Sequence, residues 1–216
     1  MPPQVHTDAI VREEGAKLVQ RLFLLPGPKA PNVVVFCGVD HGDGAVGICA
    51  LAGKNLADRT NSPVCLVDGD VHSPYLHQYF GLDNQWGLTD AVLESRPIRD
   101  FVCRLPGDNL SLLSGGSRCG EAQAPWKSER LRSRIAELRA EFPYVLINAP
   151  PVNLHIDAML LGQMADGIIL ILESNVTRRE TVRKAKEDLA AANVKLLGAV
   201  LNNRTFPIPK SLYIRL

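Results

Sequence analysis

Six short apolar runs, rich in Val, Ile and Leu, divide the chain. They are Val33–Cys37, Val64–Val67, Leu110–Leu113, Tyr144–Ile147, Gly167–Leu172 and Leu197–Leu201. The runs are continuous and do not alternate with polar residues, which is typical of strands covered on both faces of a parallel sheet. Segments with helical spacing lie between them: Gly44–Arg59, Lys127–Glu141, Ile156–Met164 and Thr177–Ala192. This order predicts a doubly wound α/β fold, a mostly parallel sheet with helices on both faces.

The length and composition of the chain favour one domain. With 216 residues and 46% apolar content, the chain can bury one core. The stretch Thr7–Leu25 has helical spacing and is followed by two prolines. We therefore expect an N-terminal helix in residues 1–28 that packs on the core or leads into it. The α/β domain then spans residues 29–203, and a short tail spans residues 204–216.

Charge, cysteines and hydropathy exclude several classes of function. The chain has 24 Lys and Arg against 23 Asp and Glu, a net charge of +1, which does not indicate a nucleic-acid-binding surface. Its five cysteines form no C-x-x-C pair, which is typical of reduced thiols in a cytoplasmic protein. No apolar run approaches the length of a membrane span. We therefore expect no direct membrane insertion, and recruitment to the inner face of a membrane would need a partner.

A glycine-rich segment after the first apolar run has half of a phosphate-binding motif. In a P-loop, glycines let backbone N–H groups surround a phosphate, a lysine neutralises the phosphates, and a Ser or Thr hydroxyl binds Mg²⁺. Here Gly42 and Gly44 supply the glycines, but Ala45 and Val46 stand where the lysine and the hydroxyl are needed. The segment can bind an anion through its backbone but lacks the side chains that bind a nucleotide together with Mg²⁺.

Polar residues also follow two other apolar runs. Asp68 and Asp70 come after the second run, and Asn148 follows the fourth. The carboxyl ends of parallel strands meet at one edge of a sheet, where ligands bind in this fold class. Each group alone is more typical of a polar turn. Their coincidence predicts a site at this edge.

The ordered motifs of the chain resemble one family, the cytosolic domains of bacterial tyrosine kinases that control capsule and exopolysaccharide synthesis, within the deviant P-loop ATPases. The resemblance covers residues 13–216 and rests on a series of blocks in the family's order. The blocks are Val64–Pro74, Leu76–Leu82, Gly87–Asp90, Asn109–Gly116, Phe142–Pro151, Asp157–Ala158, Ala165–Leu172, Thr177–Glu180 and Gly198–Asn203. The first and fifth resemble the family's two Walker blocks that bear aspartates.

This resemblance assigns roles to several positions. It implies that Asp68 and Asp70 are the acidic pair that positions Mg²⁺ and activates the attacking hydroxyl. It also implies that Asn202 lies at a position that contacts the base in related ATPases. By the same comparison Asn148 replaces the Walker B aspartate, and His72 replaces an arginine.

The replacements lead to two hypotheses for function. The leading one is a catalytically degenerate kinase-like module, with no cofactor, that acts through a membrane-bound chain-length regulator or a related kinase. The alternative is an active ATPase or tyrosine autokinase that uses ATP and Mg²⁺ with Asp68, Asp70 and a lysine from elsewhere, such as Lys54. Chromosome- and division-site-positioning ATPases share the fold, but their extra signature lysine is missing near Asp40.

Three further features bear on these hypotheses. The loops offer Asp40, His41, Asp43, Asp68, Asp70 and His72 as ligands for a divalent cation, although such loops are usually only solvated. The tail has one tyrosine, Tyr213, where the family carries a cluster. Lys17 and Gln20 stand where the family has arginines used in ring assembly, so a homo-oligomer of this chain would form without that arginine pairing.

Overall fold

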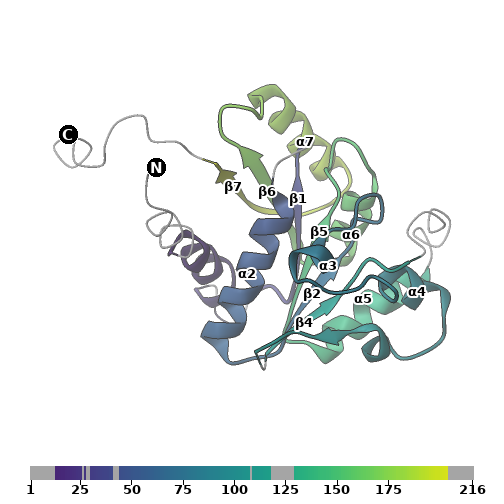
Figure 1. The fold of residues 1–216 in the computed structure, drawn as a ribbon. Helices are drawn as coiled ribbons and strands as arrows, with labels where there is room; N and C mark the ends of the chain where they lie inside the picture. Colours follow the sequence, from purple (N-terminus) through teal and green to yellow (C-terminus); the bar gives the residue numbers. More distant parts are fainter. Residues whose placement is uncertain are drawn as a thin grey trace.

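The computed structural model describes residues 13–25, 27, 30–40, 44–107, 109–117 and 129–203. Of the positions discussed above, the structure does not describe His41, Gly42, Asp43 or Tyr213. Figure 1 shows the described chain as one central sheet with helices packed around it. None of the helices in these ranges is long and apolar enough to cross a membrane.

The sheet has seven strands in the order β3-β4-β2-β5-β1-β6-β7. The strands are β1 (Val33–Gly38), β2 (Val64–Asp68), β3 (Cys103–Arg104), β4 (Leu110–Leu113), β5 (Tyr144–Ala149), β6 (Gly167–Glu173) and β7 (Leu196–Asn202). All neighbours pair in parallel except β3 and β4, which are antiparallel. The strand order reverses between β1 and its neighbours, as in doubly wound sheets. The predicted fold class is confirmed.

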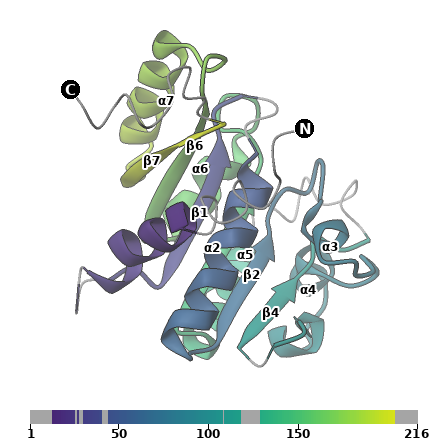
Figure 2. The same cartoon turned by 60° about the vertical axis from the view of Figure 1, so that its left-hand side comes forward.

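Helices cover both faces of the sheet (Figure 2). On one face lie helical residues 13–19, which continue into η1 (Gln20–Leu24), together with α2 (Ala45–Thr60) and α3 (Leu76–Tyr79). On the other face lie α4 (Leu88–Leu93), α5 (Glu129–Glu141), α6 (Asp157–Met164) and α7 (Arg179–Ala191). Each face has its own apolar cluster, so the central strands are buried from both sides.

The connection from β2 to β4 corrects one expectation. The sequence predicts a βαβ-like order throughout but no particular helix between Val67 and Leu110, and here α3, α4, the 3-10 turn η3 (Ile98–Phe101) and β3 lie between the two strands. These elements have only two to six residues each, too few to show a helical or strand period. Short elements held by tertiary contacts replace a single crossover helix.

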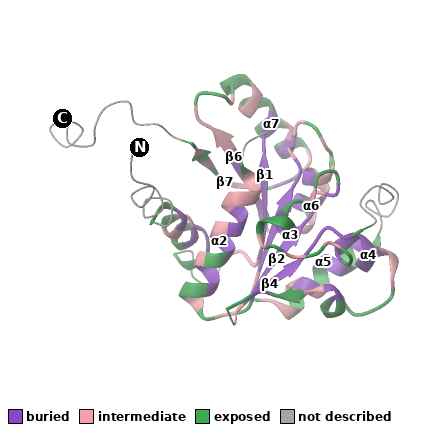
Figure 3. Cartoon of the chain, in the orientation of Figure 1, coloured by how far each residue is buried: buried purple, intermediate pink, exposed green. Residues whose placement is uncertain are grey.

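The last strand also differs from the expectation that every strand is covered on both faces. Figure 3 shows β1 buried, whereas β7 is half-buried or exposed along its length. Leu201, near its end, is 52% exposed. β7 lies at the edge of the sheet and pairs only with β6 among the described residues. Its apolar run therefore reflects pairing in the sheet more than burial in the core.

Asp166 links several elements at the amino edge of the sheet, the edge opposite the predicted site. Its Oδ2 accepts hydrogen bonds from the backbone N–H groups of Asn32 and Val33, both at 2.8 Å, and its Oδ1 pairs with Arg139 at 2.9 Å. Partial burial works to raise the pKa of Asp166, but the hydrogen bonds outweigh it and lower the pKa. This carboxylate ties the start of β1 to α5 and the start of β6.

Candidate functional site

Backbone hydrogen bonds join the loops at the carboxyl edge of the three central strands. The Gly69 N–H, after β2, donates to the Asn148 carbonyl of β5 at 2.7 Å. The N–H groups of Val152 and Asn153, after β5, donate to the carbonyls of Gly38 and Val39 at 3.0 and 3.3 Å. The loops that follow β1, β2 and β5 are therefore neighbours.

Asp68, the last residue of β2, is buried, and both of its carboxylate oxygens are hydrogen-bonded. Oδ2 accepts from the N–H groups of Tyr75 and Leu76, both at 2.8 Å, at the start of α3. Oδ1 accepts from Asn148 Nδ2 at 3.0 Å and from the Asp70 N–H at 3.4 Å. A carboxylate has about four lone-pair sites, and protein donors occupy all of them here. Burial raises the pKa of Asp68 despite these bonds.

Asn148 faces Asp68 from β5 and is 1% exposed. Its side-chain Nδ2 donates to Asp68, and its Oδ1 is buried without a hydrogen-bond partner in the described part of the chain. The direction of the amide is fixed by this contact, because an amide oxygen facing the carboxylate would give two acceptors and no proton between them. The buried Asp68 carboxylate therefore faces an uncharged hydrogen-bond donor, the Asn148 amide.

Four more of the predicted residues lie together at the start of α2. Gly44 has φ +68°, a left-handed conformation that favours glycine, and a Cβ at this position would lie 2.5 Å from Asn202 Nδ2. Ala45 and Val46 begin the helix and pack, half-buried, against the apolar cluster on the α2 face. Gly44, Ala45, Val46 and Asn202 thus lie close together, with apolar side chains in the first turn of the helix.

Asp70 and His72 lie in the exposed turn after β2. Asp70 Oδ1 accepts hydrogen bonds from the N–H groups of His72 and Ser73, both at 3.0 Å. His72 Nε2 lies 2.6 Å from Asp157 Oδ2, and its ring stacks on His155 with centroids 3.8 Å apart. The sequence analysis missed His155. The signal was its place in the loop after β5, beside the loop after β2.

Comparison with known proteins finds bacterial kinases that are similar to this chain. No family model matches it. It is 29% identical over 216 residues to the tyrosine-protein kinase YwqD of Bacillus subtilis, covering 91% of each chain. It is 28% identical over 153 residues to the tyrosine-protein kinase CpsD of Streptococcus pneumoniae, covering 70% of this chain and 67% of CpsD. The chain is a homologue of bacterial tyrosine kinases.

Solved structures agree with this homology at the level of the fold. The chimerical protein CapA2B2 matches with a TM-score of 0.80 at 24% identity, over 90% of this chain and 85% of that one. The kinase domain of the Escherichia coli tyrosine kinase ETK also gives a TM-score of 0.80, at 16% identity, over 92% and 79% of the two chains. The P-loop NTPase-like architecture of the kinase homologue is therefore intact.

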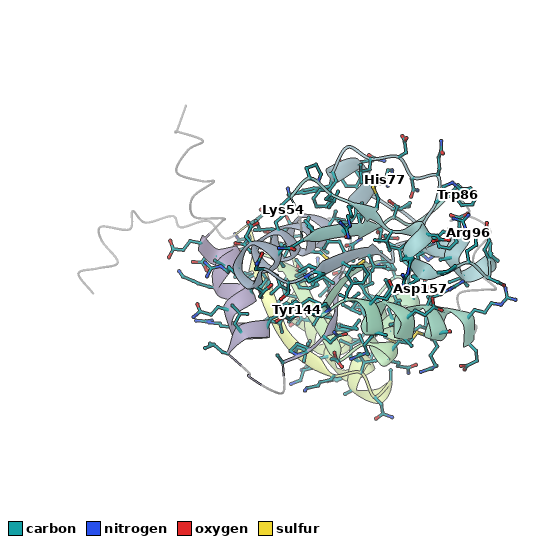
Figure 4. All side chains as sticks on the ribbon, turned by 90° about the horizontal axis from the view of Figure 1, so that it is seen from below. Lys54, His77, Trp86, Arg96, Tyr144 and Asp157 are labelled. Atoms are coloured by element: carbon teal, nitrogen blue, oxygen red, sulfur yellow. The ribbon has the colours of Figure 1, made fainter. Side chains whose placement is uncertain are left out.

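Lys54, considered above as a substitute for the missing lysine, points elsewhere in this kinase homologue. Its Nζ lies over the rings of Tyr79 and Phe80, 5.1 and 4.9 Å from their centroids. It is nine residues beyond Ala45, about 14 Å along the helix at 1.5 Å per residue. Figure 4 shows Lys54 well separated from Asp157, which marks the carboxyl edge.

Proposed function

We propose that the chain is a catalytically degenerate, tyrosine-kinase-like binding module of exopolysaccharide or capsule biosynthesis. It acts through protein partners, a membrane-bound chain-length regulator or a related kinase, and it transfers no phosphate. The pathway and the partners follow from the resemblance to the kinase family. The residues at the carboxyl edge support the loss of chemistry.

The hydrogen bond between Asn148 Nδ2 and Asp68 Oδ1 carries this proposal. Two carboxylates that face each other in a buried site repel unless a cation or a proton lies between them. In this chain the Asn148 amide takes that place and balances Asp68 without a metal ion. The hydrogen bond between Asn148 and Asp68 is therefore a structural contact that needs no metal ion.

The residues around this pair do not fit Mg²⁺ and ATP. Mg²⁺ prefers carboxylates and phosphate oxygens in octahedral geometry. Asp68 has no lone pair left, and Asn148 offers only an uncharged amide oxygen. Ala45 and Val46 offer neither the charge for a triphosphate nor a hydroxyl for the cation. We derive no phosphoryl-transfer step through this site.

Exposed apolar side chains on the neighbouring loops support a role in protein binding. Leu154 and Ile156, after β5, are 43% and 57% exposed, and Val176, after β6, is 62% exposed. In a parallel sheet these loops lie at the same edge as Asp68. Apolar side chains at this edge suit contact with a protein better than contact with a triphosphate.

Isothermal titration calorimetry of the full chain with ATP and Mg²⁺ tests the proposal. We expect no heat of binding at micromolar to millimolar nucleotide and no phosphotyrosine on the purified protein. The matched control is the triple variant Ala45→Lys, Val46→Ser, Asn148→Asp, which restores the missing groups and is expected to gain Mg²⁺-dependent binding. Micromolar binding or autophosphorylation by the unmodified chain favours the alternative, an active ATPase or autokinase.

A further inference from the structure

Two histidines and an aspartate converge outside the degenerate nucleotide site. His72 comes from the turn after β2, and His155 and Asp157 come from the loop after β5 and the start of α6 (Asp157 is labelled in Figure 4). One ligand atom from each residue can be chosen so that all three lie within 4.8 Å of one another. We propose that His72, His155 and Asp157 form a binding site for a zinc ion.

The positions of the two imidazoles argue against a simple ion pair. A His–Asp pair needs one imidazole, and the contact between His72 Nε2 and Asp157 Oδ2 supplies it. The second ring stacks on the first, with centroids 3.8 Å apart and an interplanar angle of 22°. The pair therefore does not account for the place of the His155 ring. A cation shared by both imidazoles and the carboxylate uses all three side chains.

The backbone around the cluster is already fixed. Hydrogen bonds to Asp70 Oδ1 hold the turn that carries His72. The His155 N–H donates to the Pro151 carbonyl at 3.1 Å, and Asp157 is the first residue of α6. Metal binding therefore requires side-chain rotation only, which keeps the ordering cost low.

The donor set and the geometry favour zinc. Imidazole nitrogen and carboxylate oxygen are ordinary zinc ligands at about 2.0–2.2 Å, and tetrahedral coordination places neighbouring ligand atoms about 3.3 Å apart. Here the His72–Asp157 contact is shorter, at 2.6 Å, and the longest separation is at most 4.8 Å. Asp157 must move away from Nε2 and the rings must tilt toward each other. The His72 side chain is 32% exposed, which leaves room for a water molecule as fourth ligand.

The site has a clear consequence for the fold. One ion joins the turn after β2 to the start of α6. The sequence alone offered a wider set of loop ligands that included Asp68 and Asp70. The cluster shares His72 with that set, and Asp68 and Asp70, which accept backbone hydrogen bonds, do not belong to it. His41 and Asp43, also in that set, lie outside the described residues.

Calorimetry of the EDTA-treated full chain with ZnCl₂ tests the site. All measurements are made in a Cys103→Ser, Cys119→Ser background, because free thiols also bind zinc. We expect one equivalent of zinc to bind, and His155→Gln and Asp157→Asn each to weaken binding at least tenfold. The matched control is His77→Gln, on α3 outside the cluster, which should leave the affinity unchanged.

A cobalt spectrum provides a second test that does not depend on variants that fold. Co²⁺ in this site should give visible absorption bands of a tetrahedral nitrogen and oxygen ligand set, and one equivalent of zinc should abolish them. The absence of zinc binding, or an affinity unchanged in both His155→Gln and Asp157→Asn, overturns the proposal. So does a cobalt spectrum of octahedral type that zinc does not displace. Each of these outcomes is independent of the ATP titration.

Discussion

The segments at the ends of β2 and β5 carry two groups of side chains. The groups differ in how many of their hydrogen-bonding atoms have partners within the protein. Asp68 and Asn148, at the ends of β2 and β5, form the inner pair, which is buried and in which Asp68 accepts four hydrogen bonds. His72, His155 and Asp157, a few residues further along, form the outer cluster, which is partly exposed and whose side chains contact mainly one another. A residue near a binding edge is therefore available to a ligand only where protein donors have not already occupied its lone pairs.

The largest expected effect comes from Asp68→Ala, which breaks the inner pair. It leaves the N–H groups of Tyr75 and Leu76 and the Asn148 amide without their acceptor. We expect a loss of about 3–5 kcal/mol in the free energy of unfolding, measured by urea denaturation. Asp70→Ala is the control, and it should cost less than about 1 kcal/mol because its turn is exposed. Equal losses in both variants would contradict the structural role of Asp68.

Asn148→Asp should have the next largest effect. It places a second carboxylate against Asp68 and removes the bridging amide, with an expected cost of about 2–4 kcal/mol at neutral pH. Millimolar Mg²⁺ should restore part of that loss in the variant and leave the unmodified chain unchanged, as read from melting temperatures. A variant that is as stable as the unmodified chain without Mg²⁺ would show that the two side chains do not interact.

The pH dependence of stability distinguishes the carboxylates at the two edges of the sheet. The pKa of Asp68 is raised from its ordinary 3.8, so the folded state binds the proton more tightly than the unfolded state does. The contribution of Asp68 to the stability of the folded state is present below that value and is lost as the pH rises through the pKa of the folded state. The stability advantage of the unmodified chain over Asp68→Asn should therefore shrink as the pH rises above about 4.

Asp166→Asn provides the opposite case. The pKa of Asp166 is lowered, so its contribution is present above the unfolded value of 3.8 and is lost as the pH falls through the folded pKa. The advantage over this variant should shrink toward acid pH. Urea denaturation at a series of pH values checks both variants, and slopes of the same sign would contradict the pKa directions of the two carboxylates.

The smallest effect is expected in the outer cluster without metal. Asp157→Asn in the presence of EDTA weakens a partly exposed contact with His72, and we expect a loss of about 1 kcal/mol or less. The same chemical denaturation that detects Asp68→Ala should barely detect this change. A loss as large as that of Asp68→Ala would mean that the outer cluster, like the inner pair, is a structural contact.

The sequence predicts the sheet well because its strands are continuous apolar runs. All six predicted runs are strands, the four helices predicted between them are found, and the ends that the structure describes lie within two residues of the prediction. β3 was missed because a two-residue strand has no period, and α3 and α4 are also too short to detect. The exposure of β7 follows from its place at the sheet edge, which the order of elements along the chain does not give.

The site was less predictable for a physical reason. The rule that residues after parallel strands meet at one edge pointed to Asp68, Asp70 and Asn148. It could not show that backbone donors fill the Asp68 carboxylate, because Tyr75 and Leu76 contribute only their main chain. The same rule, applied to residues further along the segments that follow β2 and β5, predicts that His155 lies near His72, which is 83 residues away in sequence.

The two hydrogen bonds from Val152 and Asn153 to the carbonyls of Gly38 and Val39 have a practical consequence. They connect the loop that carries His155 to the end of β1, directly before the glycine-rich segment. Any ligand that displaces that backbone must stretch or break these bonds first. The amide protons of Val152 and Asn153 are thus built-in reporters, whose rates of exchange with deuterated solvent record events at either loop without a label in the site itself.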